Sequence, residues 1–280
     1  MKKQAPAKIN LGLHVLHKRN DGFHAIETVF LALKWVDELT FSPSDTLSLV
    51  CSDARLSTDH TNLCMKAALA LQERFQVDRG CRMHLQKNIP FGAGLGGGSS
   101  DAATVLRQLA ESWRLPVSMT ELSEIAASLG SDVPFFLHEQ PMFATGRGEI
   151  LAPLLNADQT PYTFPFHLVV AMPQVAVPTP LAYQLITPNN HLRPDLREVV
   201  CTNDPKYWRK ALVNDFQIPI LAHFPAISHV ATLFEETNAV YTSLSGSGAA
   251  FFGVFERAEE AHSATKLFQD HHIKVWTDAP

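Results

Sequence analysis

Features that would mark several common classes of protein are missing from this sequence of 280 residues. Its four cysteines, Cys51, Cys64, Cys81 and Cys201, show no Cys-x-x-Cys spacing, which argues against a zinc site or a disulfide framework and favours reduced thiols. There are 13 histidines, but neither a His-Glu-x-x-His motif nor a Cys/His quartet occurs. A Gly-x-Ser-x-Gly nucleophile elbow is also absent, so a hydrolase of that class is not indicated.

An excess of basic charge and long apolar runs are missing as well. The formal net charge of -5 argues against a nucleic-acid-binding surface, which normally carries a basic excess or stripe. No stretch approaches the roughly 18 uninterrupted apolar residues of a membrane-spanning helix. Residues 1–6 lack the apolar core of a signal peptide. We therefore expect a cytoplasmic protein with no nucleic-acid partner, no membrane partner and no obligatory protein partner.

The most informative segment is the glycine-rich run at residues 90–103, Pro-Phe-Gly-Ala-Gly-Leu-Gly-Gly-Gly-Ser-Ser-Asp-Ala-Ala. Its glycines and serines directly precede an amphipathic helical pattern over residues 100–113. Glycine lets the backbone approach an anion closely, and a helix start offers unpaired N–H groups and a positive dipole end. The segment therefore predicts a phosphate-binding loop and a nucleotide or other phosphorylated ligand.

Three well-known phosphate loops do not fit this run. Gly92, Gly94 and Gly97 satisfy the spacing Gly-x-Gly-x-x-Gly, but the acidic residue that a dinucleotide-binding fold needs about 20 residues later falls at Glu111, inside the expected helix. The loop ends in Gly-Ser-Ser without the lysine of a Walker A motif. The His-Arg-Asp and Asp-Phe-Gly signatures of protein kinases are absent. A less common class of glycine-loop kinase remains.

Apolar periodicity predicts a mixed α+β chain. Apolar residues alternate with polar ones over residues 9–15, which is the period of a half-buried strand and places Lys8 and Asn10 on one face. Ser118 and Glu121 form a capping box for a helix that ends at Gly130. The other expected strands cover residues 28–30, 47–51, 81–85, 167–171 and 249–255, and the other expected helices cover 61–75, 207–213 and 229–237.

The hydrophobic content of 46% and the chain length predict two domains. A tract rich in proline, asparagine and threonine at residues 151–165 is the candidate boundary, and a proline-rich loop is expected around 178–180. We expect one domain over residues 1–155, which contains the glycine-rich run, and a C-terminal α+β domain over residues 156–280. The family resemblance given in the next paragraph implies that the first domain binds ATP and is catalytic and that the second completes the substrate cleft.

Four separate motifs, in order along the chain, resemble those of the GHMP kinase superfamily. They are residues 6–13, the loop at 90–100, the Gly-Ser-Asp-Val-Pro segment at 130–134 and the Ser-Leu-Ser-Gly-Ser-Gly segment at 243–248. Residues 19–28 resemble the members whose substrate is a cytidine-diphosphate-linked methylerythritol. The resemblance implies a two-domain α+β architecture, with an N-terminal domain like ribosomal protein S5 and a C-terminal ferredoxin-like domain. It also implies a kinase of the non-mevalonate isoprenoid precursor pathway.

The resemblance further implies transfer of the ATP γ-phosphate to the 2-hydroxyl of the methylerythritol moiety. Such a transfer needs positioning and charge stabilisation more than covalent chemistry from the protein. Asp132, in the family's Gly-x-Asp-x-Pro motif, would take the hydroxyl proton as general base, although the position alone is also that of an ordinary helix-end carboxylate. Lys8 matches the catalytic lysine, which would support the Asp132 charge and the transferring phosphoryl group. Asn10 would bind the polyol or the catalytic pair.

The ATP contacts implied by the resemblance involve the glycine-rich run, through backbone N–H groups and two hydroxyls. They are Pro90, Phe91, Gly92, Ala93, Gly94, Leu95, Gly96, Gly97, Gly98, Ser99 and Ser100, together with Asn62 and Lys87. ATP chemistry also implies Mg²⁺. Apart from Ser99 as a possible contributor, the sequence does not identify the metal ligands.

On the substrate side, the resemblance implies that Phe23, His24, Thr179 and Tyr183 recognise the cytidine group. The family often has tyrosine at the position of Phe23, and stacking on a base tolerates this exchange. The segment at 214–219 matches its family counterpart imperfectly. Two alternatives remain open: a related kinase that phosphorylates homoserine, mevalonate or a sugar, and a catalytically silent nucleotide-binding regulator.

Overall fold

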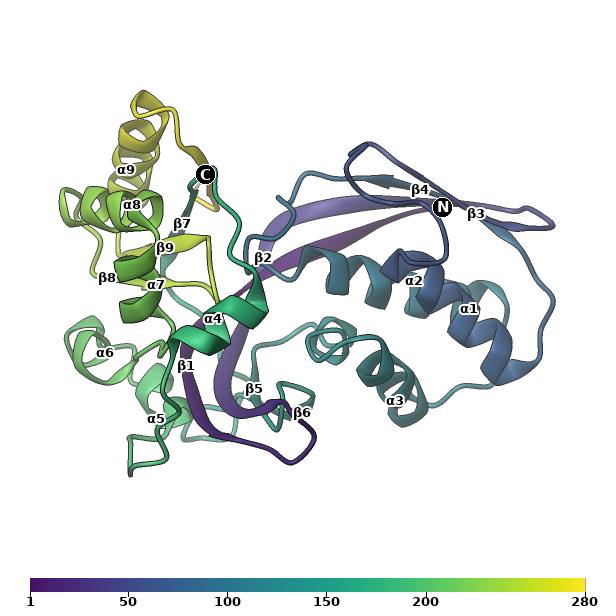
Figure 1. Ribbon diagram of the computed structural model, residues 1–280, viewed down its shortest axis with the longest axis horizontal. Helices are drawn as coiled ribbons and strands as arrows, with labels where there is room; N and C mark the ends of the chain where they lie inside the picture. Colours follow the sequence, from purple (N-terminus) through teal and green to yellow (C-terminus); the bar gives the residue numbers. More distant parts are fainter. Residues whose placement is uncertain (280) are drawn as a thin grey trace. The chain divides into compact units, whose positions relative to one another are not determined.

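The computed structural model describes residues 1–279, and within them the chain forms two compact units (Figure 1). The first unit contains residues 1–8, 32–91 and 96–139. The second contains residues 9–31, 92–95 and the chain from 140 onward. Each unit is thus built from several segments, whereas the expected domains 1–155 and 156–280 are contiguous. That contiguous division stays a prediction.

In the first unit, helices lie together on one side of a small sheet (Figure 1). Strand β3 pairs in parallel with β4, and β4 pairs antiparallel with the second half of β2, over Glu38–Ser42. The elements are β1 (Lys2–Lys18) and β2 (His24–Ser42), which both continue into the second unit, β3 (Leu47–Cys51), α1 (Leu63–Phe75), β4 (Cys81–Gln86), α2 (Gly97–Ser112), α3 (Met119–Leu129) and the 3-10 helix η1 (Pro134–Leu137).

Local capping explains where the helices of the first unit begin. The Ser118 side chain accepts a hydrogen bond from the Glu121 N–H, and α3 ends before Gly130, so the serine cap and the helix end predicted from the sequence are confirmed. The Glu121 carboxylate accepts Arg74 Nε at 2.8 Å, so the second half of the predicted capping box stays a prediction. Helix α2 begins at Gly97, three residues before the expected start at residue 100. Gly96 precedes it with a φ of 67°, a left-handed conformation that ends the loop and starts the helix.

The second unit contains an antiparallel sheet with the strand order β10-β7-β9-β8. With α8 and α9 packed against it, the chain order is β7-α8-β8-β9-α9-β10, which is the ferredoxin-like βαββαβ pattern that the resemblance implied. The elements are β5 (Met142–Thr145), β6 (Ile150–Pro153), β7 (His167–Met172), α4 (Thr179–Leu185), α5 (Leu196–Cys201), α6 (Pro205–Ala211), α7 (Gln217–His223), α8 (Pro225–Glu235), β8 (Tyr241–Leu244), β9 (Phe251–Phe255), α9 (Ala258–Asp270) and β10 (Lys274–Thr277).

Two segments expected to be irregular contain regular structure. Strand β6 lies partly inside the expected linker tract at 151–165, because it pairs with β5, and β5 in turn pairs with β2 at Thr28–Phe30. Helix α4 begins at Thr179, within the expected proline-rich loop, since Pro180 is compatible with the first turn of a helix. Within residues 1–279 no single helix is long and apolar enough to cross a membrane. Taken together, α7 and α8 have the length and composition of a membrane-spanning segment, but the chain bends by 116° at their junction.

The expectation that residues 9–15 form a half-buried strand is wrong, because β1 is buried on both faces there. Leu13 and Val15 belong to the hydrophobic core of the second unit. The alternate residues Asn10 and His14 are 1% and 2% exposed. The polar positions therefore do not mark a solvent face, because they are enclosed by protein.

Burial of His14 gives the stability of the fold a pH dependence. Burial, followed by the Arg193 charge, lowers the pKa of His14 to about 4, against the opposing effect of Asp215. An unfolded histidine binds its proton near pH 6.5, so between that pH and about 4 the unfolded chain binds more protons. The stabilisation is complete above pH 6.5, and we expect about 3 kcal/mol to be lost as the pH falls to 4.

Urea unfolding of wild type and His14→Gln at pH 7.5, 6, 5 and 4 tests this expectation. The glutamine variant keeps a polar side chain but has no proton to bind in this range. The free energy of unfolding of the wild type is expected to fall more steeply below pH 6.5, and parallel curves for the two proteins would contradict the assignment.

Candidate active site

Lys8 and Asp132 meet in the first unit. Asp132 lies two residues beyond Gly130, where α3 ends, and its Oδ2 is 3.4 Å from Lys8 Nζ. The Lys8 side chain is 4% exposed and the Asp132 side chain 33%. The structure thus brings together the two residues expected to be catalytic. A carboxylate that is reachable from solvent and supported by a buried ammonium can accept a proton from an alcohol.

The start of α2 packs directly against Lys8. A Cβ at Gly96 would lie 3.1 Å from Lys8 Cγ and 2.8 Å from Phe136 Cζ, so glycine is the residue that allows the close approach. The N-cap residue Gly96 has no side chain that could accept the first N–H groups of α2, and such uncapped N–H groups are the usual donors to a bound anion. Ser99 and Ser100 lie in this first turn, and within residues 1–279 the buried Ser100 Oγ has no hydrogen-bond partner.

Residues 92–95 of the loop are held by the late Ser-Gly motif within the second unit. The Ala250 N–H donates to the Ala93 carbonyl at 3.0 Å, and Ser245 Oγ donates to the Gly94 carbonyl at 3.1 Å. Asn214 Nδ2 in turn donates to the carbonyls of Leu244 and Gly246. A motif 151 residues away in the sequence therefore fixes the conformation of the glycine-rich run.

Gly94→Ala is expected to destabilise the protein by about 1–3 kcal/mol and to raise KM for ATP. Gly94 has a φ of 76°, and a Cβ there would lie 2.3 Å from the Ser245 carbonyl oxygen. Gly92→Ala is the matched control, because Gly92 has a similar φ of 72° but open space around the Cβ position. Denaturant unfolding and ATP kinetics of both variants separate the effect of backbone strain from that of the steric clash between the new Cβ and the Ser245 carbonyl oxygen. Equal effects at the two positions would contradict this account.

Lys87 is held by two buried carboxylates. Its Nζ forms an ion pair with Asp37 Oδ2 and a second one, at 2.8 Å, with Asp101 Oδ2. Burial acts to lower the pKa of Lys87, but Asp101 and Asp37 outweigh it and raise that pKa. Burial raises the pKa of Asp101 to about 7, against the opposing effect of Lys87. A Cβ at Gly97 would lie 3.2 Å from Lys87 Nζ, so this cluster supports the first residue of α2.

Asp37 also binds the chain segment that leads into the glycine-rich run. It is fully buried, and its Oδ1 accepts the N–H groups of Asn88 at 2.6 Å and Ile89 at 2.9 Å. The sequence analysis does not identify Asp37 and Asp101 as residues of the site. Asp101 stands in the first turns of the expected helix and could have been singled out there, whereas nothing near Asp37 in the sequence indicates its partners.

Asn62, another expected ATP contact, has a local structural role. Its side chain accepts the Cys64 N–H at 2.9 Å and so caps α1. Its Nδ2 donates to the Ser57 carbonyl at 2.6 Å. A contact of Asn62 with ATP stays a prediction.

Two of the expected substrate residues in the second unit, His24 and Tyr183, contact each other. The rings of His24 and Tyr183 are stacked with centroids 4.7 Å apart and planes 14° apart, and Tyr183 also contacts Phe216 edge-on. Phe23 is 52% exposed, and the guanidinium of Arg147 lies 4.8 Å from its ring centroid. Burial, followed by the nearby Lys18 charge, lowers the pKa of His24.

The two remaining substrate candidates lie on β1 and α4. Thr179 begins α4, the helix that carries Tyr183. Asn10 Nδ2 donates to Thr28 Oγ1 at 2.9 Å, and that hydroxyl donates to the Gly12 carbonyl at 2.6 Å. This chain of bonds fixes the orientation of the Asn10 amide.

Comparison with known proteins identifies the family. Residues 62–140 match the family described as GHMP kinases N terminal domain. A 4-diphosphocytidyl-2-C-methyl-D-erythritol kinase from Salinibacter ruber is 46% identical over 274 residues, which cover 98% of this chain and 96% of that protein. The chain belongs to the 4-diphosphocytidyl-2-C-methyl-D-erythritol kinase family. A kinase of this name from Chlorobium phaeobacteroides is 45% identical over 98% of this chain and 96% of its own length.

Solved structures agree with membership of this kinase family. A crystal structure of 4-(cytidine 5'-diphospho)-2C-methyl-D-erythritol kinase matches with a TM-score of 0.81 and 33% identity, over 99% of this chain and 98% of that one. A mevalonate kinase from Methanococcus jannaschii matches with a TM-score of 0.72 over 99% and 97% of the two chains, but at 10% identity it shares the fold alone. The α+β GHMP kinase fold expected from the sequence is confirmed.

Proposed function

We propose that this chain transfers the γ-phosphate of ATP to the 2-hydroxyl of 4-diphosphocytidyl-2-C-methyl-D-erythritol, with Asp132 as the general base. The observation that carries the proposal is the Lys8–Asp132 pair, which lies against the glycine start of α2. Asp132 accepts the hydroxyl proton, the resulting oxygen nucleophile attacks the γ-phosphorus, and ADP leaves. The Lys8 ammonium offsets negative charge that develops on the transferring group.

The glycine-rich run supplies the phosphate contacts in this proposal. The uncapped N–H groups of α2 would bind phosphate oxygens, helped by the helix dipole and by the Ser99 and Ser100 hydroxyls. Lys87, with its two carboxylate partners, would fix the position of this helix start.

Mg²⁺ would enter with the nucleotide. Within residues 1–279, no group of three or more His, Cys, Asp or Glu side chains is placed to hold a metal ion. The Ser99 and Ser100 hydroxyls are hard oxygen donors of the kind that a magnesium ion accepts beside substrate phosphates, so the residues present fit such an ion. When bound, Mg²⁺ would neutralise part of the negative charge on the phosphates.

Specificity for a cytidine-bearing alcohol would come from Phe23, His24 and Tyr183. The exposed Phe23 ring offers a stacking surface, and the Tyr183 ring is held edge-on by Phe216. Arg147, next to Phe23, is a cation within reach of the same ring.

Tyr183→Ala is expected to raise KM for the cytidine substrate by roughly 5- to 150-fold, which corresponds to about 1–3 kcal/mol of lost stacking. KM for ATP is expected to stay unchanged, because the ring of Tyr183 packs on His24 and Phe216, which lie outside the glycine-rich run. Steady-state kinetics with each substrate varied in turn provide the measurement. Equal increases in both KM values would argue against a role in cytidine recognition.

ATP consumption by the purified protein with Mg²⁺ tests the proposed function. The acceptors to compare are 4-diphosphocytidyl-2-C-methyl-D-erythritol, homoserine, mevalonate and galactose. Turnover with the cytidine compound alone is the expected result. Turnover with another acceptor would contradict the proposed substrate and favour a related kinase activity. ATP binding without any turnover would favour a nucleotide-binding regulator.

A further inference from the structure

Thr28 places a hydroxyl group in the interior of the second unit. The residue is fully buried on β2, and its main chain pairs with Ala144 of β5, so the sheet sets its position. Threonine is also β-branched, which restricts its side-chain rotamer. The hydroxyl donates to the Gly12 carbonyl at 2.6 Å and accepts Asn10 Nδ2 at 2.9 Å. A single hydroxyl on β2 therefore connects two residues of the neighbouring strand β1.

The two bonds of the Thr28 hydroxyl determine which end of the Asn10 amide faces it. A hydroxyl has one hydrogen to donate, and a carbonyl oxygen can only accept, so that hydrogen is committed to Gly12. Toward Asn10 the hydroxyl can therefore only accept a hydrogen bond. The amide carries its hydrogens on Nδ2, so Nδ2 is the atom that lies against Thr28. Oδ1 consequently points away from Thr28, because the two atoms lie on opposite sides of the amide carbon.

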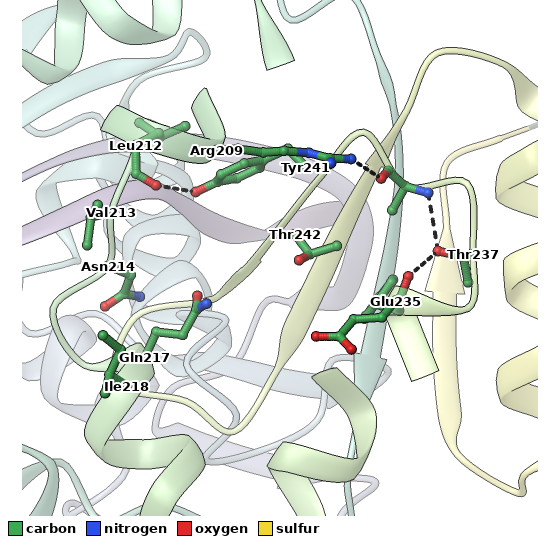
Figure 2. A pocket seen from close by; sticks show the side chains of 12 residues that line it. Arg209, Leu212, Val213, Asn214, Gln217, Ile218, Glu235, Thr237, Tyr241 and Thr242 are labelled. Carbon is green, nitrogen blue, oxygen red and sulfur yellow. Dashed lines mark hydrogen bonds between the residues drawn. The ribbon is translucent and has the colours of Figure 1, made fainter. Parts of the chain in front are cut away.

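The Gly12 carbonyl that takes the hydroxyl hydrogen is itself held in place. Gly12 has a φ of 72°, and a Cβ there would lie 2.8 Å from the side chains of Leu196 and Leu212. Leu212 is fixed in turn, since its carbonyl accepts the Tyr241 hydroxyl at 2.7 Å (Figure 2). Backbone conformation and close packing thus keep this carbonyl directed toward Thr28.

We propose that Thr28 is a positioning residue, which acts through Asn10 on the alcohol that accepts the phosphate. The inference rests on the proposed function and on the expected contact of Asn10 with the polyol. The reacting hydroxyl has one hydrogen, which the proposed general base takes, so Asn10 Oδ1 accepts a hydrogen bond from a neighbouring hydroxyl of the polyol. Thr28 fixes this acceptor before the substrate binds, and such preorganisation favours phosphoryl transfer.

Thr28→Val tests the role of the hydroxyl. Valine keeps the size and branching of the side chain, but Asn10 loses the acceptor that orients its amide. We expect kcat/KM for the cytidine substrate to fall at least about tenfold. Thr28→Ser keeps the hydroxyl and is expected to retain most of the wild-type value. The affinity for a non-hydrolysable ATP analogue, measured by calorimetry, is expected to stay unchanged in both variants.

Asn10→Ala separates positioning from a purely structural role. If Thr28 acts through Asn10, Thr28→Val causes no further loss of kcat/KM in the Asn10→Ala background. A structural role through the Gly12 carbonyl would instead lower kcat/KM by the same factor in both backgrounds. That result would overturn the proposal, and so would wild-type activity of Thr28→Val.

The wild-type protein provides a measurement that needs neither variant, so it also holds if Thr28→Val proves too unstable to purify. One hydrogen of the Asn10 side-chain amide is bonded to Thr28 Oγ1 in the interior. In ¹H–¹⁵N spectra of the full chain, we expect this amide to exchange with D₂O more slowly than exposed asparagine side chains do. Equally rapid exchange would overturn the proposal. Slow exchange without turnover of any acceptor would contradict the proposed function instead, so the two failures are distinguishable.

Discussion

Asp132→Ala is expected to lower kcat by at least about 10²-fold, the usual scale for removal of a general base, while ATP binding is retained. The carboxylate lies 3.4 Å from Lys8 Nζ and is partly open to solvent. Without it, the alcohol must lose its proton to water. ATP binding is expected to persist because the phosphate contacts proposed for α2 come from main-chain groups and hydroxyls.

Asp132→Asn and Glu139→Ala make this experiment specific. The asparagine variant keeps the size and shape of the side chain but has no basic oxygen, so it is expected to lose as much kcat as the alanine variant. Glu139 is an exposed carboxylate in the same unit, paired with Arg107 at 3.1 Å, and its replacement is expected to leave kcat unchanged. Binding of a non-hydrolysable ATP analogue, measured by calorimetry, reports nucleotide affinity separately. Full activity of Asp132→Asn would exclude Asp132 as the base.

Asp37→Ala is expected to lower the free energy of unfolding by about 3–5 kcal/mol, as is typical when one member of a buried ion pair is removed. Asp37 is fully buried and is paired with Lys87, so the lysine would keep one carboxylate, Asp101, where it now has two. The N–H groups of Asn88 and Ile89 would lose their acceptor. Urea unfolding, followed by tryptophan fluorescence, measures the change.

Asp37→Asn separates the two contributions. Its amide oxygen can still accept the Asn88 and Ile89 N–H groups, so its loss is expected to be smaller than that of the alanine variant and to reflect the ion pair with Lys87. Glu38→Ala is the matched control on the same strand, because Glu38 forms a largely exposed pair with Lys2 that contributes about 0–1 kcal/mol. If Asp37→Ala proved as stable as Glu38→Ala, the support assigned to this cluster would be wrong.

The helices and strands that the sequence predicts best are those with a local cause. The helix at 63–75 begins after Asn62, and the helix at 119–129 has a capping serine and a terminal glycine, so both were predicted to within two residues. The predicted start of α2 lies three residues too late, because glycine has a low intrinsic helix propensity, whereas the fold places Gly97 and Gly98 in the first turn of the helix. Strand β6 was missed since its pairing with β5 lies outside any local pattern.

The alternating pattern at residues 9–15 shows a different limit of sequence reasoning. Period-two alternation reports which residues share a face of a strand. It cannot tell a solvent face from an enclosed polar one. In the structure, Asn10 and His14 are buried, because other segments of the chain cover them.

The class of loop, the order of the motifs and the kinase family can be read from the sequence alone, because they depend on residue types at short spacings, and the family resemblance also implied that Lys8 acts with Asp132. The tertiary structure was needed to show that Asp37 holds the segment before the loop and that Ser245 bonds Gly94. Each of these contacts joins segments far apart in the chain, and their pairing depends on how strands align and which surfaces are buried together. A period or a capping residue acts over a few positions and carries no information about such partners.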